Sequence, residues 1–198
     1  MTEPRRKFRR ICVFCGSNTG HDPRFVEAAR DFGARIARRG LGLVYGGGRV
    51  GLMGAVADGA LSEGGEVLGV IPELLRSLEL GHEGVTELFV VDGMHARKSM
   101  MANLSDAFVA LPGGFGTLEE IFEATTWTQL NYHRKPVGLL NVGGYYDGLV
   151  GFLDGALASG FIRPIHRGLL ATDSDPERLL DVLATAEIPE LQQWMSKP

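Results

Sequence analysis

Residues 109–127 have the sequence VALPGGFGTLEEIFEATTW, which runs from an apolar segment through a proline and three glycines to two glutamates. The apolar residues are typical of a buried strand, and Pro112 should end that strand because proline cannot donate to a ladder. The glycines that follow permit a tight turn whose amides can point toward an anion. We therefore expect a strand, a turn, and a helix from Thr117 to about Leu130.

Apolar runs and amphipathic runs alternate in the same way on both sides of this stretch. The expected strands lie in residues 9–17, 41–48, 66–72, 86–92, 106–114 and 135–142. The expected helices lie in residues 21–40, 52–65, 94–105, 117–130, 145–160 and 175–186. Buried strands that alternate with helices predict a parallel sheet covered on both faces. The expected fold class is thus α/β, a single-domain, Rossmann-like, doubly wound sheet.

Signals at the ends of two expected helices support this assignment. Asp22 and Pro23 should open the first helix, and Gly40 should end it. Asp175 and Pro176 should open the last one.

Three glycine-bearing junctions follow expected strands, at residues 15–18, 45–54 and 111–117. In open parallel sheets ligands bind beyond the carboxyl ends of the strands, so these junctions should form one site. The second junction only loosely resembles a dinucleotide fingerprint, because it follows the second strand and the next strand does not end in an acidic residue. It also lacks the Gly-Lys-Ser/Thr of a Walker A loop.

Composition limits the classes of function. The chain has 198 residues, 44% hydrophobic and 22% charged residues, and a formal net charge of −4. This charge predicts no nucleic-acid partner, and the absence of an apolar run of roughly 18 residues predicts no membrane span and a cytoplasmic location. The basic run at residues 5–10 suggests a solvated tail over residues 1–8, followed by one domain over residues 9–198.

Cysteine and histidine spacing argues against a metal site. Cys12 and Cys15 form a C-x-x-C pair, but residues three apart on a strand point to opposite faces. A second cysteine pair, an H-E-x-x-H motif and a pair of histidines four residues apart are all missing. We expect two ordinary buried thiols and no metal.

Two interpretations of Thr117 and Glu120 remain open on local sequence alone. The T-x-x-E pattern is a capping box, in which Glu120 only caps the helix. Alternatively, the glycine turn binds phosphate and Glu120 is a working carboxylate. Arg97 and Lys98 favour the second interpretation, because cations are mildly unfavourable at a helix start unless an anion lies nearby.

Three motifs taken together are more specific: GGGRVGLMG at residues 46–54, MHARK at residues 94–98 and PGGFGTLEE at residues 112–120. In this order they resemble the LONELY GUY (LOG) family of cytokinin riboside 5'-monophosphate phosphoribohydrolases, many of which were once labelled lysine decarboxylases. The resemblance extends from about Arg9 to about Leu183.

The resemblance implies hydrolysis of the N-glycosidic bond of AMP or prenylated AMP, giving a free base and ribose 5-phosphate. It assigns Arg97 and Glu120 to catalysis, implies a homodimer and requires no cofactor. The expected substrate-binding residues, taken from the resemblance and from the composition of these segments, are Ser17, Gly47, Gly48, Glu79, Met94, Lys98, Gly113, Gly114, Phe115, Gly116, Thr117, Glu119 and Thr126.

The chemistry fits a carboxylate at this position. Departure of the base leaves an oxocarbenium-like ribosyl cation, which ionised Glu120 could stabilise while it orients or deprotonates water. A nucleotide-binding or cofactor-carrier protein would need the glycine turns but no such carboxylate. A lysine decarboxylase would hold pyridoxal phosphate on a lysine, for which only Lys98 is suitably placed.

Overall fold

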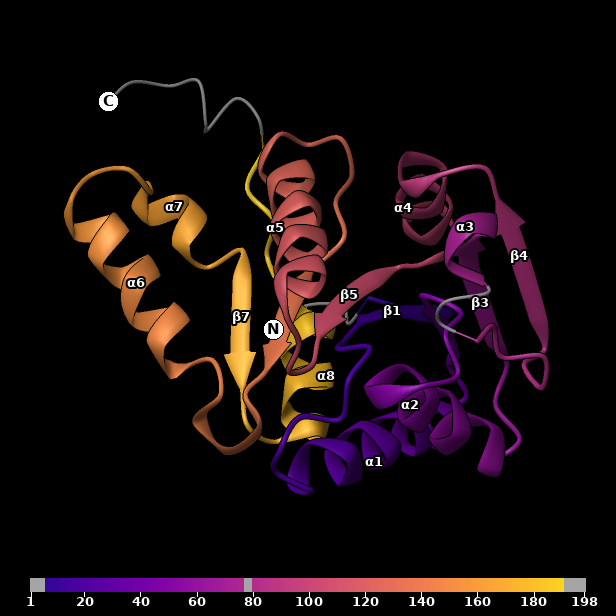
Figure 1. Ribbon diagram of the computed structural model, residues 1–198. Coiled ribbons are helices and arrows are strands. Elements are labelled where there is room, and N and C mark those ends of the chain that lie inside the picture. The colour runs from indigo at the N-terminus through magenta and orange to yellow at the C-terminus, as the bar shows by residue number, and fades with distance from the viewer. Residues whose placement is uncertain (1–5, 77–79, 191–198) are drawn as a thin grey trace.

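The computed structural model describes residues 6–76 and 80–190, and in them seven strands form one sheet (Figure 1). The strands are β1 (Arg10–Phe14), β2 (Gly42–Tyr45), β3 (Val67–Pro72), β4 (Glu87–Val91), β5 (Ala107–Ala110), β6 (Val137–Leu140) and β7 (Leu170–Asp173). All neighbouring strands are parallel, in the order β4-β3-β2-β1-β5-β6-β7. The direction of progression reverses between β1 and β5, which makes their carboxyl ends the switch point where ligands bind in such sheets. The predicted doubly wound α/β class is confirmed.

Helices cover both faces of the sheet. They are α1 (Arg24–Arg38), α2 (Gly51–Ser62), α3 (Glu73–Arg76), α4 (Met94–Leu104), α5 (Phe115–Gln129), α6 (Asp147–Ala158), α7 (Pro164–Arg167) and α8 (Pro176–Thr185), with a 3-10 turn η1 (Val142–Gly144). Figure 1 shows α1, α2 and α8 on one side of the sheet and α4, α5 and α6 on the other. Among the described helices, none combines the length and the apolar character that a bilayer crossing requires.

The central strands alternate between two buried clusters, which explains their continuous apolar sequences. Ile11 and Val13 pack in the cluster that contains α1, α2 and α8, whereas Cys12 and Phe14 pack in the cluster that contains α4, α5 and α6. Cys12 and Cys15 are buried free thiols in opposite clusters, as predicted. Burial raises the pKa of both thiols, so they should be chemically inert.

The predicted helix ends are formed with small shifts. The Asp22 carboxylate accepts the Arg24 N–H at 2.9 Å, although α1 begins at Arg24 and not earlier. Gly40 takes a left-handed φ of 70° after α1 and donates to the Ala37 carbonyl. Asp175 caps α8 by accepting two backbone N–H groups.

Strand β7 and the short helices α3 and α7 were not predicted. Strand β7 has four residues, of which one is fully buried, so it lacks the apolar run that identified the other strands. It forms because Val137–Leu140 offers it a free edge of the sheet. The two helices have four residues each, too few for a helical period to be recognised.

Residues 6–8 of the expected tail contact the domain. The Arg6 N–H donates to the Ala184 carbonyl at 2.8 Å, and its guanidinium donates to the Arg134 carbonyl at 2.9 Å. Phe8 packs against the α1-side cluster. The ordered domain thus includes part of the basic run, because that run lies beside the end of α8.

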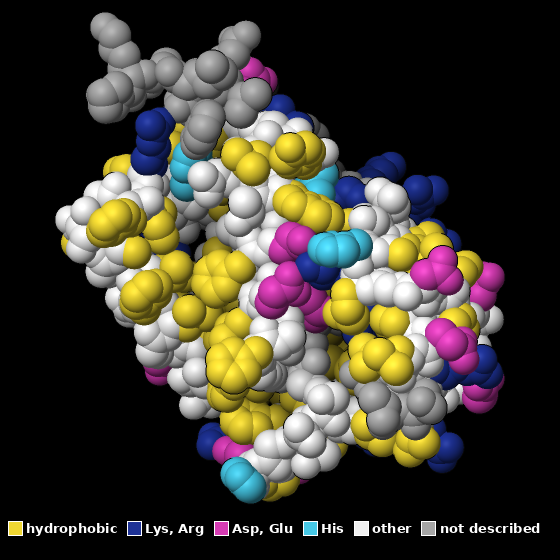
Figure 2. All heavy atoms as spheres, turned by 45° about the horizontal axis from the view of Figure 1, so that its top comes forward, with side chains coloured by type: hydrophobic (Ala, Val, Ile, Leu, Met, Phe, Trp, Pro, Cys, Tyr) yellow, Lys and Arg dark blue, Asp and Glu magenta, His cyan; other side chains and the backbone are white. Residues whose placement is uncertain are grey.

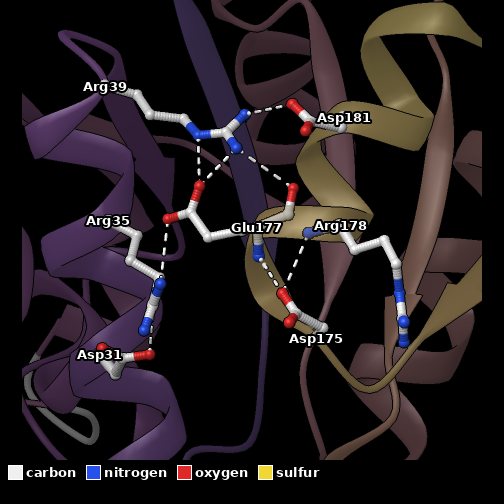
Figure 3. A network of polar contacts seen from close by, with 7 residues as sticks. All are labelled: Asp31, Arg35, Arg39, Asp175, Glu177, Arg178 and Asp181. Atoms are coloured by element: carbon white, nitrogen blue, oxygen red, sulfur yellow. Dashed lines mark hydrogen bonds and ion pairs between the residues drawn. The ribbon is translucent and has the colours of Figure 1, made fainter.

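An ion-pair network joins α8 to α1 (Figure 3). Arg35 binds Asp31 at 2.6 Å and Glu177 at 3.1 Å, and Arg39 binds both Glu177 and Asp181. These side chains are partly exposed, so each pair should contribute little energy alone, but the network fixes the position of the last helix.

His133 packs against Phe108 and Trp127 of the cluster that contains α4, α5 and α6, and it gives the fold a predictable response to acid. Its ring stacks on Phe108 at a centroid distance of 5.3 Å, and its Nδ1 accepts the Lys135 N–H at 3.4 Å. Burial, assisted by the Lys135 charge, lowers the pKa of His133 to about 4.

The unfolded chain should therefore bind a proton at His133 between about pH 6.5 and pH 4 while the folded chain does not, so stability should fall as the pH falls through this window. Because the ring is partly exposed, we expect the wild type to lose about 1 kcal/mol more than His133→Asn between pH 7 and pH 5. Urea unfolding at both pH values measures this difference, with His21→Asn as the exposed control. Equal losses in wild type and His133→Asn would contradict it.

Candidate active site

A pocket of about 490 Å³ lies at the carboxyl ends of β1, β2 and β5, at the switch point of the sheet. Residues of the helices α1 to α5 and of the loop before α6 also line it. The pocket brings together these predicted site residues: Ser17, Met94, Arg97, Gly113, Gly114, Phe115, Gly116, Thr117 and Glu120.

The start of α5 differs from the sequence-based expectation. The helix begins at Phe115, with extended Gly114 as its N-cap, so Thr117 is the third helical residue and is buried. Thr117 is therefore not the N-cap, and the capping-box interpretation of Thr117 and Glu120 is wrong. Glu120 lies in the second turn, where the helix terminus affects it less than expected, and it lines the pocket.

The turn before α5 has the properties of an anion site. The first N–H groups of a helix have no helical acceptor, and they carry the positive end of the helix dipole. Space beside Gly114 and Gly116 is open, since a Cβ at either position would meet nothing within 4 Å. Gly113 is packed instead, because its Cβ would lie 2.1 Å from the Thr117 Oγ1. An anionic group can thus approach the turn at Gly114 and Gly116, while packing against Thr117 fixes the turn at Gly113.

Arg97 enters the pocket from the first turn of α4 and is 6% exposed. Its Nη2 donates to the Gly46 carbonyl at 3.0 Å, and its Nη1 lies 3.9 Å from the Met94 sulfur. Its buried Nε has no hydrogen-bond partner within residues 6–76 and 80–190. A buried cation with an unused donor is costly unless an anion binds beside it. This arrangement favours an anionic ligand.

The charges of Arg97 and Glu120 both affect Cys15, so the two side chains lie near the same part of the pocket wall. Burial raises the pKa of the Cys15 thiol; the charge of Glu120 raises it further, whereas that of Arg97 opposes the shift. Cys15 itself lines the pocket. The site therefore holds one cation and one carboxylate next to an anion-binding turn.

Gly46 is required for the position of Arg97. A Cβ at residue 46 would lie 2.0 Å from Nη2 of Arg97, so Gly46→Ala must displace the guanidinium. For the nucleotide hydrolysis that the motif resemblance implies, we expect kcat/KM to fall by about 100-fold, the effect of a misplaced group in an active site. Steady-state kinetics measures this, with Gly148→Ala as the control because a Cβ there meets nothing within 4 Å. Full activity in Gly46→Ala would exclude a role for the observed Arg97 position.

Several predicted site residues lie outside the pocket. Lys98 and Glu119 are not in the pocket lining, and Lys98 links α4 to α5 by binding Glu119 at 2.5 Å and Glu123 at 3.0 Å. Burial alone would lower the pKa of Lys98, but these hydrogen bonds outweigh it and raise that pKa. The hydroxyl of Thr126 donates to the Phe122 carbonyl within α5.

Of the three glycines that follow β2, only Gly46 lines the pocket, whereas Gly47 and Gly48 were the predicted binding residues. Gly46 lines the pocket, whereas the Gly47 carbonyl accepts the His82 N–H and Gly48 pairs with Gly81. Glu79 lies outside the described residues.

Sequence reasoning missed some residues of the pocket wall. Tyr145, Phe25 and Leu75 line it but were not predicted. Tyr145 had a usable signal, because it follows β6, the neighbour of β5, and both strands end at the same edge.

Neither a metal cluster nor a pocket lysine is present in the part of the chain that the structure describes. No three His, Cys, Asp or Glu side chains gather there as possible ligands. None of the described lysines Lys7, Lys98 and Lys135 lines the pocket, so a Schiff-base lysine for a decarboxylase is not found among them.

The parallel sheet and the pocket at its switch point define a doubly wound, Rossmann-like α/β protein with a ligand site that contains a buried arginine and a carboxylate. Sequence comparison identifies the family within this class. The model of a family described as "Possible lysine decarboxylase" matches residues 53–183.

Curated relatives are more specific. The chain is 48% identical over 197 residues to "Cytokinin riboside 5'-monophosphate phosphoribohydrolase LOG7" of Arabidopsis thaliana, with 100% of this chain and 90% of that protein covered. It is 52% identical over 177 residues to "Probable cytokinin riboside 5'-monophosphate phosphoribohydrolase LOGL9" of Oryza sativa subsp. japonica, with 89% and 78% covered. The chain belongs to the LONELY GUY family, as the motifs predicted.

Solved structures with the same fold include cofactor-binding proteins. The molybdenum cofactor binding protein of Rippkaea orientalis has a TM-score of 0.65 and 25% identity, with 89% of this chain and 95% of that chain covered. The molybdenum cofactor carrier protein of Chlamydomonas reinhardtii has a TM-score of 0.65 and 24% identity, with 96% and 100% covered, and supports the fold alone.

Proposed function

We propose that this protein hydrolyses the N-glycosidic bond of adenine-type nucleoside 5'-monophosphates, including cytokinin riboside 5'-monophosphates, to release the free base and ribose 5-phosphate. The observation that carries the proposal is the joint lining of one pocket by the α5 turn, buried Arg97 and Glu120. The phosphate would bind the turn, where free N–H groups and a helix dipole favour an anion. Similarity to the LOG7 and LOGL9 enzymes supports this substrate class.

In this mechanism the bond between the anomeric carbon and the base nitrogen breaks, and its electron pair leaves with the base. The Glu120 carboxylate stabilises the oxocarbenium-like ribosyl group and accepts a proton from the attacking water. The water oxygen bonds to the anomeric carbon, and the released base takes up a proton. One nucleotide and one water thus give one free base and one ribose 5-phosphate. Arg97 would hold the nucleotide and Glu120 in position.

The alternative is a nucleotide-binding or cofactor-carrier protein without turnover. Identity near 50% with phosphoribohydrolases, against 25% with the Rippkaea cofactor-binding protein, favours the hydrolase. A carrier would also have no use for a carboxylate beside the anion site. Independence from a cofactor and a cytoplasmic location remain predictions from sequence.

The deciding experiment incubates the protein with AMP and with isopentenyl-AMP, without added metal, and separates the products by chromatography. We expect free base and ribose 5-phosphate, and the ratio of the two rates gives the effect of the prenyl group. Intact nucleotides that nevertheless bind would favour the carrier.

We also infer that the protein is a homodimer. Large hydrophobic side chains are exposed, including Phe115 (94%), Phe152 (70%) and Phe161 (90%). Figure 2 shows groups of hydrophobic side chains on the face that is turned forward from the top of Figure 1. Such a surface is typical of an interface. Sedimentation velocity of the purified protein tests the inference, and a monomer at micromolar concentration would contradict it.

A further inference from the structure

Three consecutive carbonyl groups before α5 are each held by a donor from another segment. The hydroxyl of Tyr146 donates to the Leu111 carbonyl at 2.6 Å, and the hydroxyl of Tyr145 donates to the Gly113 carbonyl at 2.7 Å. The carbonyl of Pro112, which lies between these two residues in the chain, accepts the Gly16 N–H at 3.0 Å. The peptide groups of the turn are therefore fixed from outside.

The loop after β6 is built to present these two tyrosines. Gly143 and Gly144 have left-handed φ values of 59° and 79°, which allow a sharp turn that other residues would resist. The Asn141 side chain then accepts the Tyr146 N–H at 2.7 Å and donates to the Asp147 carboxylate at 2.7 Å. Asn141 at the start of the loop thus binds residues 146 and 147 at its end and holds the loop closed.

The two tyrosines occupy different environments. Tyr146 is 1% exposed and belongs to the core, so its hydroxyl has a structural setting. Tyr145 is 44% exposed, lines the pocket, and packs edge-on against Phe25 at a centroid distance of 5.5 Å. Loss of the Tyr145 hydroxyl should therefore leave the ring, the fold and the pocket wall in place.

Peptide orientation matters at an anion site, because rotation of one peptide plane replaces an inward N–H with an inward carbonyl. A carbonyl oxygen repels phosphate, whereas an N–H binds it. The Gly113 carbonyl belongs to the peptide that carries the Gly114 N–H, so the Tyr145 hydroxyl keeps that oxygen from turning toward the ligand.

We propose that Tyr145 is a positioning residue that orients the peptide between Gly113 and Gly114 in the α5 turn and thereby sets the affinity of the site for the substrate phosphate. The nature of the ligand rests on the proposed function, but the geometry applies to any phosphate-bearing ligand of this pocket. Tyr145 acts through the backbone and does not touch the reacting bond.

Calorimetric titration with ribose 5-phosphate, which has no glycosidic bond to hydrolyse, tests the proposal. We expect Tyr145→Phe to weaken binding about five- to tenfold, the usual effect of one lost hydrogen bond. In kinetics with AMP, KM should rise by the same factor while kcat changes less than about twofold, because phosphate binding is weakened equally in the ground state and in the transition state. Tyr132→Phe is the control, since Tyr132 is an exposed tyrosine remote from the pocket lining.

The outcomes separate this proposal from the proposed function. Wild type that binds ribose 5-phosphate but hydrolyses nothing would refute the hydrolase, and the titration of Tyr145→Phe would still decide the present inference. Unchanged binding in Tyr145→Phe, or a fall in kcat with constant KM, would overturn it.

Discussion

Replacement of Glu120 with glutamine should lower kcat for nucleotide hydrolysis by about 10²–10⁴-fold, the range for removal of a general base. Glutamine keeps the shape of the side chain but loses the charge that stabilises the ribosyl cation and accepts the water proton. Glu120 does not cap α5, which begins at Phe115, so the helix should be unaffected. We expect the variant to fold like the wild type, because glutamine preserves the size and shape of the side chain.

Rapid-quench or steady-state assays with AMP measure the loss, and ribose 5-phosphate titration shows whether the site remains formed. Glu63→Gln is a matched control, because it removes one surface ion pair, with Arg38, far from the pocket lining. If Glu120→Gln bound ribose 5-phosphate and retained wild-type kcat, Glu120 could not be the working carboxylate. Another group would then have to activate the water.

Much of the fold could be predicted because its signals are local. Each central strand is buried on both faces, so its residues form an uninterrupted apolar run, and helices with polar faces separate these runs. The order of the runs predicts a parallel sheet, and the sheet predicts a site at the strand ends. Strand β7 has a single fully buried residue and therefore gives no such signal.

The site was predicted less completely because neighbouring residues of a helix point in different directions. Arg97 and Lys98 are adjacent on α4 and project about 100° apart, so only one of them can enter the pocket. The sequence contains both cations and cannot say which is inside. The structure puts Arg97 in the pocket and pairs Lys98 with Glu119 and Glu123.

The start of α5 was mispredicted for a related reason. The T-x-x-E pattern of Thr117 and Glu120 matches a capping box, so the local sequence indicated Thr117 as the start of the helix. Tertiary contacts decide otherwise: Gly113 packs against Thr117 and against the backbone of Gly16 in the turn after β1. This packing draws the helix start two residues earlier and buries the threonine.

Replacement of Arg97 with methionine should lower kcat/KM for AMP by at least about 100-fold without destabilising the ligand-free protein. The guanidinium is buried and its Nε has no hydrogen-bond partner among the described residues, so its desolvation is incompletely compensated. Methionine has a similar length and no charge, and water in the open pocket can bind the Gly46 carbonyl that Arg97 now binds. We expect the free energy of unfolding to remain unchanged or to rise by up to about 2 kcal/mol.

Thermal unfolding with and without ribose 5-phosphate separates the two effects. In wild type the ligand should raise Tm, because it binds only the folded state, and in Arg97→Met this increase should be lost. Arg38→Met is the control, since it removes an exposed arginine paired with Glu63 and should leave the increase intact. A large fall in Tm for ligand-free Arg97→Met would mean that the guanidinium mainly supports the fold through Gly46. An unchanged or higher Tm together with lost activity would mean that the chain keeps a costly buried cation for its ligand.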